Sequence, residues 1–125
     1  MAAIAEDGVL EGQCPLSVTV RVQGTTTVIE LRGEWDLAGE PAVEQALRSV
    51  FDGDPECVVL DLSRLGFIDS SGLQATVDLA HRAAARGVRL VIIPGSRAVQ
   101  SPFEMCGLVA TLPFIDPRVV SGDAR

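Results

Sequence analysis

The sequence predicts an α/β protein, in which helices pack against a mixed β-sheet of four to five strands in the order ββαβαβα. Three observations support this fold class. Residues 16–22 alternate between apolar and polar side chains, as a strand with one buried face does. Residues 57–62 and 88–93 are largely apolar, which is typical of strands covered on both faces. Because a helical apolar pattern over residues 70–86 joins these last two strands, we expect them to be parallel, with a right-handed crossover.

The first half of the chain is expected to form a hairpin followed by a helix. Gly24-Thr25 supplies a turn after the first strand, and residues 27–31 return as the second strand. The segment Gly33-Glu34-Trp35-Asp36 closes that strand. Pro41 then stands at the first position of a helix, where its missing N–H is not needed, and Gly53 ends that helix.

The last helical segment is complicated by Pro102, because proline breaks the interior of a helix. We therefore predict a turn over residues 96–100, followed by a short helix. In that helix Ser101 is the N-cap, Pro102 takes the first position, and Glu104 completes a capping box. Residues 108–114 are expected to add a short final strand.

Length and composition predict one domain with loose ends. A chain of 125 residues is long enough for a single hydrophobic core. We assign residues 15–116 to this domain and the polar segments 1–14 and 117–125 to flexible tails. The N-terminal segment lacks the basic stretch of a signal peptide, and no apolar run approaches the length of a membrane span. We therefore expect a soluble, cytoplasmic protein that does not bind membranes.

Charge and residue usage argue against several functions. The net charge is −7 and no cluster of basic residues is present, so we expect no binding to nucleic acid. Three scattered cysteines and one histidine, His81, do not predict a metal site. His81 lies about three helical turns from Ser71, too far for a serine–histidine pair on one helix. A glycine-rich phosphate loop is also missing, so we expect no catalytic residues and no cofactor.

The most informative segment is Asp69-Ser70-Ser71-Gly72, at the junction between the predicted strand and the helix that follows it. A helix N-terminus presents free N–H donors and a partial positive charge, so it tolerates a phosphoryl group. The alternative is that these residues only cap the helix, which Asp and Ser do well. Both roles can coexist if Asp69 or Ser70 caps, Ser71 is exposed, and Gly72 leaves the backbone approachable.

Three further residues have structural and functional interpretations. Trp35 is the only tryptophan, and we favour its partial burial in the core over a position on a partner-binding surface. Asp36 and Asp61 follow predicted strands, where they act as cap or loop residues. The two carboxylates would form a metal pair only with further ligands that the sequence does not supply.

These features together resemble the STAS-domain anti-anti-sigma factors, also called anti-sigma factor antagonists. The resemblance extends over about residues 15–115, so the predicted domain is STAS-like. Its most specific part is the DSSGL stretch in its strand–loop–helix setting. The resemblance rests on four segments, which are GEWD, VVLDLSRLGFIDSSGL, VRLVIIPG and SRAVQSPFEMCGL.

The resemblance implies a phosphorylation switch on the second serine of the pair, Ser71. The unmodified protein would bind a partner that is both a serine kinase and an anti-sigma factor, which frees a sigma factor. Phosphorylation of Ser71 would end that binding, and a phosphatase would restore it. ATP would be bound by the kinase, so the resemblance implies no cofactor in this chain. The implied partner-binding residues are Asp36, Asp69, Ser70, Ser71 and Gly72.

The chain departs from the family pattern in two places. Residues 37–40 replace the polar start that is common at the first helix of relatives, and Pro102 interrupts the third helix. Both changes bear on the choice of partner. The alternative function is a STAS-like regulatory module that is not phosphorylated, and that binds a small ligand such as a nucleotide or docks to a larger assembly.

Overall fold

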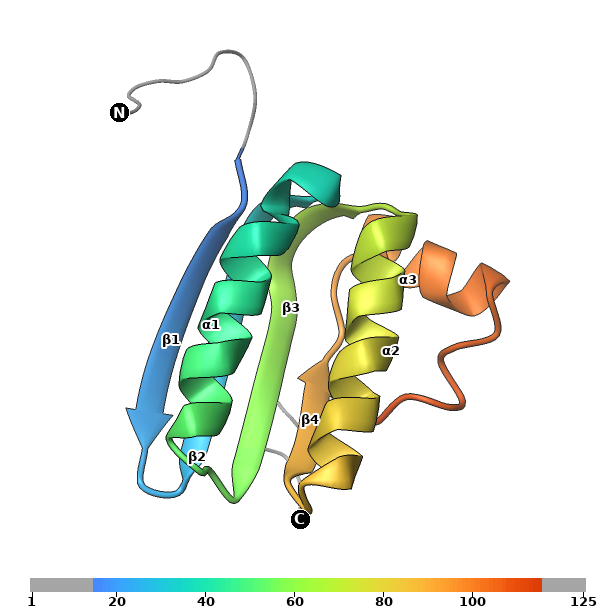
Figure 1. Ribbon diagram of the computed structural model, residues 1–125. Helices are drawn as coiled ribbons and strands as arrows, with labels where there is room; N and C mark the ends of the chain where they lie inside the picture. Colours follow the sequence, from blue (N-terminus) through green and yellow to red (C-terminus); the bar gives the residue numbers. More distant parts are fainter. Residues whose placement is uncertain (1–14, 116–125) are drawn as a thin grey trace.

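A computed structural model describes residues 15–115 of the chain as an α/β fold (Figure 1). The predicted order of elements is confirmed, with a short 3-10 helix η1 added before α1. The predicted tails, 1–14 and 117–125, lie outside the described residues. The elements are β1 (Ser17–Gln23), β2 (Thr26–Trp35), η1 (Leu37–Gly39), α1 (Glu40–Asp52), β3 (Cys57–Ile68), α2 (Ser70–Ala85), β4 (Arg89–Ile93) and α3 (Arg97–Met105).

The four strands form one mixed sheet in the order β1-β2-β3-β4. Strands β1 and β2 are antiparallel and form the predicted hairpin, whereas β2–β3 and β3–β4 are parallel pairs. Helices α1 and α2 lie side by side over one face of the sheet (Figure 1). Because each helix connects two parallel strands, both start at the same end of the sheet, where β2 and β3 finish.

Strands β2 and β3 are longer than the sequence predicts. The hydrophobic pattern suggests ends near Leu31 and Leu62, but the strands continue to Trp35 and Ile68. Those two terminal residues are paired with each other. The β2–β3 pairing shifts register twice before them, between Glu30 and Arg32 and between Gly33 and Glu34. Pairing between the strands therefore overrides the polar local sequence.

The hydrophobic core lies between the sheet and the helices, and it includes Trp35. The Trp35 side chain is 1% exposed, so it is buried more completely than we predicted. The largest fully buried side chains also include Phe103, Ile29, Leu31, Leu60, Leu62 and Ile92.

The prediction for the third helix is wrong. The structure has one continuous helix, α3, with Ser96 as its N-cap and Pro102 inside it. Neither Ser101 nor Glu104 forms the expected capping box. Val99 and Phe103 lie one turn apart on the buried face of α3, and both are 0% exposed. Their packing compensates for the hydrogen bond that Pro102 cannot donate.

The predicted final strand over residues 108–114 is also wrong. Phe114 forms a single isolated bridge beside Ile92 of β4, so the sheet has four strands. The Phe114 ring instead packs edge-to-face on Phe103, with 5.1 Å between the ring centroids. This aromatic pair holds the segment after α3 against the core. No helix within residues 15–115 is long and apolar enough to span a bilayer.

Candidate functional site

The ends of β2 and β3 bring two acidic residues to the same rim of the sheet. Trp35 and Ile68 are the last paired residues of the two parallel strands. The N–H of Asp69 then donates a hydrogen bond to the Trp35 carbonyl, at 3.1 Å. Asp36 and Asp69 therefore leave the sheet next to each other, as expected for the carboxyl ends of neighbouring parallel strands.

Asp69 is the N-cap of α2. Its Oδ1 accepts hydrogen bonds from the backbone N–H of Ser71, at 2.9 Å, and from that of Gly72, at 3.3 Å. The same oxygen accepts the Ser71 hydroxyl proton, with 2.6 Å between Oγ and Oδ1. One carboxylate thus satisfies two of the free N–H donors of the first helical turn and also orients the serine side chain.

This hydrogen-bond network keeps Asp69 ionised. The Ser71 hydroxyl is the main cause that lowers the pKa of Asp69, and the backbone N–H groups of Gly72, Ser71 and Leu37 lower it further. Desolvation opposes these effects but does not outweigh them. A carboxylate with a lowered pKa is a weak base, so it positions the Ser71 hydroxyl more than it activates it.

The structure separates the two serines. Ser70 is exposed and its side chain makes no hydrogen bond with the described residues, whereas Ser71 is half-buried and bound to Asp69. Of the two capping candidates that the sequence left open, Asp69 is the cap. Both hydroxyls are therefore available for roles other than capping.

Gly72 belongs to the first turn of α2 and is buried. A Cβ at this position would lie 2.6 Å from Ile68 Cγ1 and 3.1 Å from Trp35 Cδ2. The close approach that needs a glycine is thus to the chain's own core, and it lets α2 begin directly above Trp35. A role for Gly72 in partner binding stays a prediction.

Asp36 does not contact the Ser71 hydroxyl through a hydrogen bond. Its Oδ1 accepts from the Ala38 N–H, at 3.1 Å, so it caps the short helix η1. The neighbouring Leu37 N–H helps to lower the pKa of Asp69, which connects the two acidic residues through one residue of backbone. Asp36 also lines a hollow of about 170 Å³, smaller than the roughly 300–1,000 Å³ that is typical of small-molecule sites.

The other sequence candidates lie away from this rim. Asp61 lies within β3, and not after it as expected, where it accepts hydrogen bonds from the Ser63 N–H and hydroxyl. His81 is exposed on α2. Residues 15–115 contain no group of three or more His, Cys, Asp or Glu side chains arranged to hold a metal ion.

Two exposed apolar side chains near the acidic residues were missed by the sequence analysis. Leu37 is 70% exposed directly after Asp36, and Phe67 is 45% exposed two residues before Asp69. The alternation of strand side chains would have indicated Phe67, because Ile68 faces the core and its neighbour must face away. Apolar side chains beside a polar site are typical of protein-binding surfaces.

Comparison with known proteins identifies the family, and it confirms the resemblance seen in the sequence. The chain belongs to the STAS-domain family, because a family model described as "Mlab, STAS domain" matches residues 18–113. The anti-sigma-F factor antagonist RsfB of Mycobacterium tuberculosis is 27% identical to this chain over 96 residues. That alignment covers 77% of this chain and 78% of RsfB.

Solved structures show the same fold. A crystal structure of an anti-sigma factor antagonist from Mycobacterium paratuberculosis superposes with a TM-score of 0.71 and 26% identity, over 79% of this chain and 84% of that one. The anti-sigma factor antagonist SpoIIAA in its unphosphorylated form superposes with a TM-score of 0.68 and 22% identity, over 85% of this chain and 97% of that one. The Bacillus cell fate determinant SpoIIAA in its phosphorylated form superposes with a TM-score of 0.63 and 22% identity, over 87% of this chain and 100% of that one. RsfB and the Mycobacterium paratuberculosis protein are both named as anti-sigma factor antagonists.

Proposed function

We propose that this protein is an anti-sigma factor antagonist controlled by phosphorylation of Ser71. The unphosphorylated form binds an anti-sigma factor kinase and thereby releases a sigma factor. Phosphorylation of Ser71 switches the binding off, and a phosphatase acting on phospho-Ser71 restores it. The observation that carries this proposal is the 2.6 Å hydrogen bond between Ser71 and Asp69 at the start of α2.

The named relatives support the same assignment. RsfB is an anti-sigma-F factor antagonist, and SpoIIAA has been solved both unphosphorylated and phosphorylated. A cytoplasmic location follows from the proposal, because a sigma factor acts inside the cell. No catalytic residue is assigned to this chain, since the kinase brings both ATP and the phosphoryl-transfer groups.

The chemistry of the site explains how one phosphoryl group would end binding. Phosphorylation replaces the Ser71 hydroxyl proton, so the hydrogen bond to Asp69 is lost. The new group carries a charge of about −1.5 to −2 and stands beside an ionised carboxylate. A helix N-terminus stabilises a negative charge by about 0.3–2 kcal/mol. Asp69 already accepts the N–H groups of Ser71 and Gly72, so these two donors are not free for the phosphoryl group.

The partner surface would surround this serine. Ser70, Ser71 and Asp69 lie at the start of α2, and Asp36 lies on the neighbouring strand end. An unpaired dianion buried against a packed partner costs several kcal/mol, and each ~1.4 kcal/mol weakens binding tenfold. The fold therefore persists while the complex dissociates.

A reconstitution experiment tests the proposal. Purified anti-sigma factors from the same genome are incubated with the protein and labelled ATP, and complex formation is measured before and after labelling. We expect one kinase to bind the unmodified protein, to phosphorylate it, and to release it afterwards. Labelling without loss of binding would contradict the switch, and an absence of binding to every anti-sigma factor would contradict the function.

A further inference from the structure

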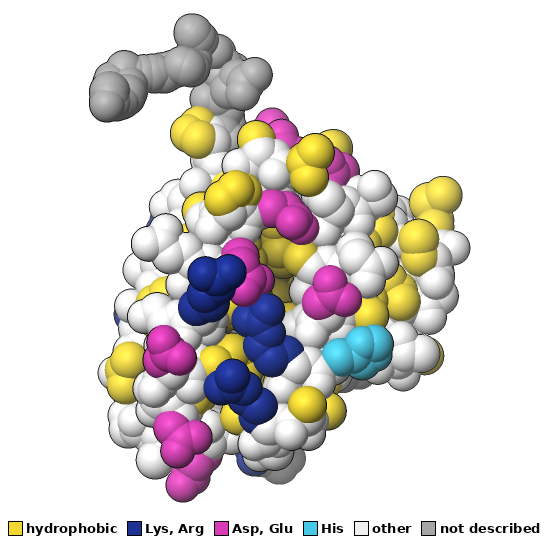
Figure 2. Space-filling view, in the orientation of Figure 1, with side chains coloured by type: hydrophobic (Ala, Val, Ile, Leu, Met, Phe, Trp, Pro, Cys, Tyr) yellow, Lys and Arg dark blue, Asp and Glu magenta, His cyan; other side chains and the backbone are white. Residues whose placement is uncertain are grey.

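A hollow of about 90 Å³ lies between α1 and α2, and Ala75, one helical turn after Ser71, is the residue of its lining nearest to Ser71 along α2. It is visible near the middle of the face in Figure 2, with hydrophobic side chains at its bottom and both acidic and basic side chains around it. Its volume suits a few water molecules or the end of one long side chain. The apolar side chains that line it are Val43, Leu47, Ala75 and Leu79.

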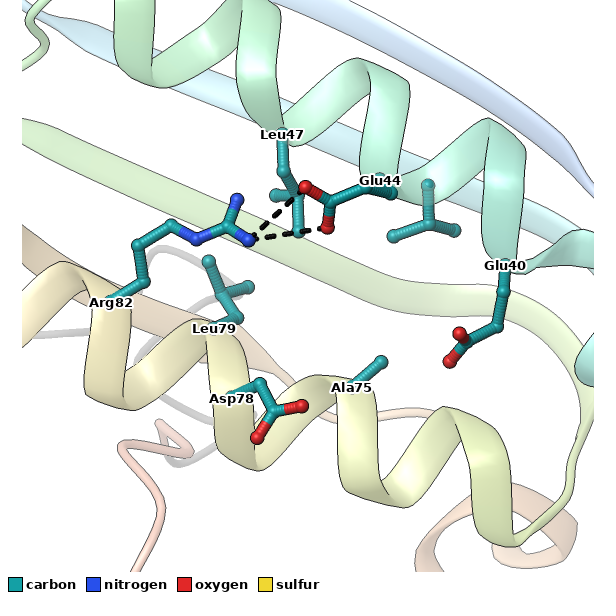
Figure 3. Close-up of a pocket in the computed structure, with 8 residues that line it drawn as sticks. Glu40, Glu44, Leu47, Ala75, Asp78, Leu79 and Arg82 are labelled. Atoms are coloured by element: carbon teal, nitrogen blue, oxygen red, sulfur yellow. Dashed lines mark hydrogen bonds and ion pairs between the residues drawn. The ribbon is translucent and has the colours of Figure 1, made fainter.

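The end of the hollow farther from Ser71 is closed by an ion pair between the two helices. Arg82 Nη2 of α2 lies 3.2 Å from both carboxylate oxygens of Glu44 of α1 (Figure 3). Arg48 also pairs with Glu44, at 3.3 Å. The Glu44 carboxylate at this end is therefore already paired within the molecule, with two arginines.

The end nearer Ser71 carries two carboxylates, and none of the described residues that line it there is a cation. Glu40 lies one turn before Glu44, and Asp78 lies one turn before Arg82, on helices that start at the same end of the sheet (Figures 1 and 3). Neither forms an ion pair with any described residue, and Asp78 accepts only a hydrogen bond from Gln74, at 3.1 Å. The end farther from Ser71 thus holds an ion pair of opposite charges, whereas this end holds two negative charges.

We propose that this hollow receives an arginine side chain of the anti-sigma factor when the two proteins bind. This inference rests on the proposed function and adds a second contact to the Ser71 surface. The guanidinium would lie between Glu40 and Asp78, in the way that the chain's own Arg82 lies against Glu44 one turn away.

Arginine fits this hollow better than other side chains. Its methylene stem packs on the apolar residues, while its planar head donates to two carboxylates at once. A metal ion fits less well, because the described residues offer no group of three acidic, histidine or cysteine ligands. An acidic partner segment would meet two unpaired carboxylates of the same sign.

The position of the hollow explains why the same partner would reach it. Ala75 lies four residues after Ser71, so the two side chains occupy adjacent turns of the same face of α2. A partner that covers Ser71 therefore extends over the mouth of the hollow. Both contacts belong to one interface, which fixes the orientation of the partner on the helices.

Binding of the full-length anti-sigma factor to matched variants tests the inference. The double variant Glu40→Gln/Asp78→Asn removes both charges, and asparagine can still accept from Gln74. We expect Kd to rise at least about tenfold, with a weaker dependence of Kd on salt concentration. Glu56→Gln is the control: it removes one exposed carboxylate next to the start of β3, at the other end of the sheet, and should leave Kd unchanged.

A charge exchange identifies the partner residue. Asp78→Arg should weaken binding, and replacing one arginine of the anti-sigma factor with glutamate should restore it. If the wild type binds and both charge variants bind equally well, this inference is wrong while the proposed function stands. If the wild type binds no anti-sigma factor, both fail together. Thermal melts of each variant establish that its fold is intact.

Discussion

Asp69 and Ser71 share one hydrogen bond that joins the structure of the helix to the chemistry of the site. The Ser71 hydroxyl donates to the carboxylate that caps α2, at 2.6 Å. Any modification of that hydroxyl therefore changes the environment of the cap. The same carboxylate receives two backbone N–H groups, so the helix start remains anchored when the serine bond is lost.

Ser71, and not Ser70, is expected to be the phosphorylated residue. Asp69 holds the Ser71 hydroxyl in one orientation, whereas the Ser70 side chain has no hydrogen-bond partner among the described residues. Ser71→Ala should abolish labelling by the kinase, and the matched variant Ser70→Ala should retain it. Mass spectrometry of the labelled protein locates the phosphate. Labelling of Ser71→Ala at Ser70 would show that the assignment is wrong.

Ser71→Asp should stay folded but lose binding to the anti-sigma factor. A carboxylate at this position imitates part of the phosphoryl charge, and it stands beside the ionised Asp69 at a helix start that accepts negative charge. Ser71→Ala should bind constitutively, because it cannot be phosphorylated. Circular dichroism, thermal melts and titration calorimetry on the same samples separate folding from binding. Unfolding of Ser71→Asp, or binding equal to the wild type, would refute an electrostatic switch.

The pKa of Asp69 should depend on Ser71. The Ser71 hydroxyl is the main cause of the lowered value, so Ser71→Ala should raise the pKa of Asp69 toward that of a free aspartate. Carbon-detected NMR titration of the Asp69 carboxyl measures this change. Ser70→Ala serves as the control and should leave the Asp69 titration unchanged.

The same shift gives stability a defined pH dependence. A lowered pKa in the folded state stabilises the protein above the unfolded pKa of about 3.9, and this contribution is lost as the pH falls through the folded value. Asp69→Asn keeps part of the capping and should lose this acid-range dependence. Unfolding measurements between pH 2 and pH 5, a range of about one to two units around that reference, compare the two proteins. If the free energy of unfolding depends on pH in the same way in the wild type and in Asp69→Asn, the proposed role of Asp69 is wrong.

Gly72→Ala should destabilise the fold and disturb the start of α2. The new Cβ would lie 2.6 Å from Ile68 Cγ1, so the helix or the core must shift, at a cost of about 1–3 kcal/mol. Alanine recovers only about 1 kcal/mol through its better helix propensity. Denaturant unfolding gives the net loss, and the emission of Trp35, which contacts the same position, reports the shift. Gly66→Ala, whose nearest atom would be 3.5 Å away, should be nearly neutral in packing.

The sequence predicted the parts of the site that depend on local order along the chain. An apolar strand, an Asp-Ser-Ser-Gly segment and a helical pattern follow one another, so the position of Ser71 at a helix start could be inferred directly. The choice of Asp69 over Ser70 as the cap could not, because both residue types cap well and only the backbone path decides between them.

Other features depend on contacts between distant segments. The extension of β3 to Ile68 crosses polar residues, and it forms because β2 continues beside it. α3 remains continuous through Pro102 because Val99 and Phe103 are buried in the core. The hollow between α1 and α2 exists only through the relative register of two helices. A hydrophobic pattern read along one segment contains none of this information.

Asp36→Asn should weaken partner engagement more than folding. Asp36 caps η1 through the Ala38 N–H, and asparagine can make the same hydrogen bond. The substitution therefore removes the charge and keeps the cap. The free energy of unfolding should fall by less than the ~0.5–2 kcal/mol that is lost when a capping residue is replaced by alanine. Because Asp36 lies beside Asp69 at the ends of β2 and β3, loss of its charge should reduce the affinity for the kinase or the rate of Ser71 phosphorylation. Asp36→Ala, which removes both cap and charge, measures the structural part separately. Unchanged binding and phosphorylation in Asp36→Asn would leave Asp36 with a structural role alone.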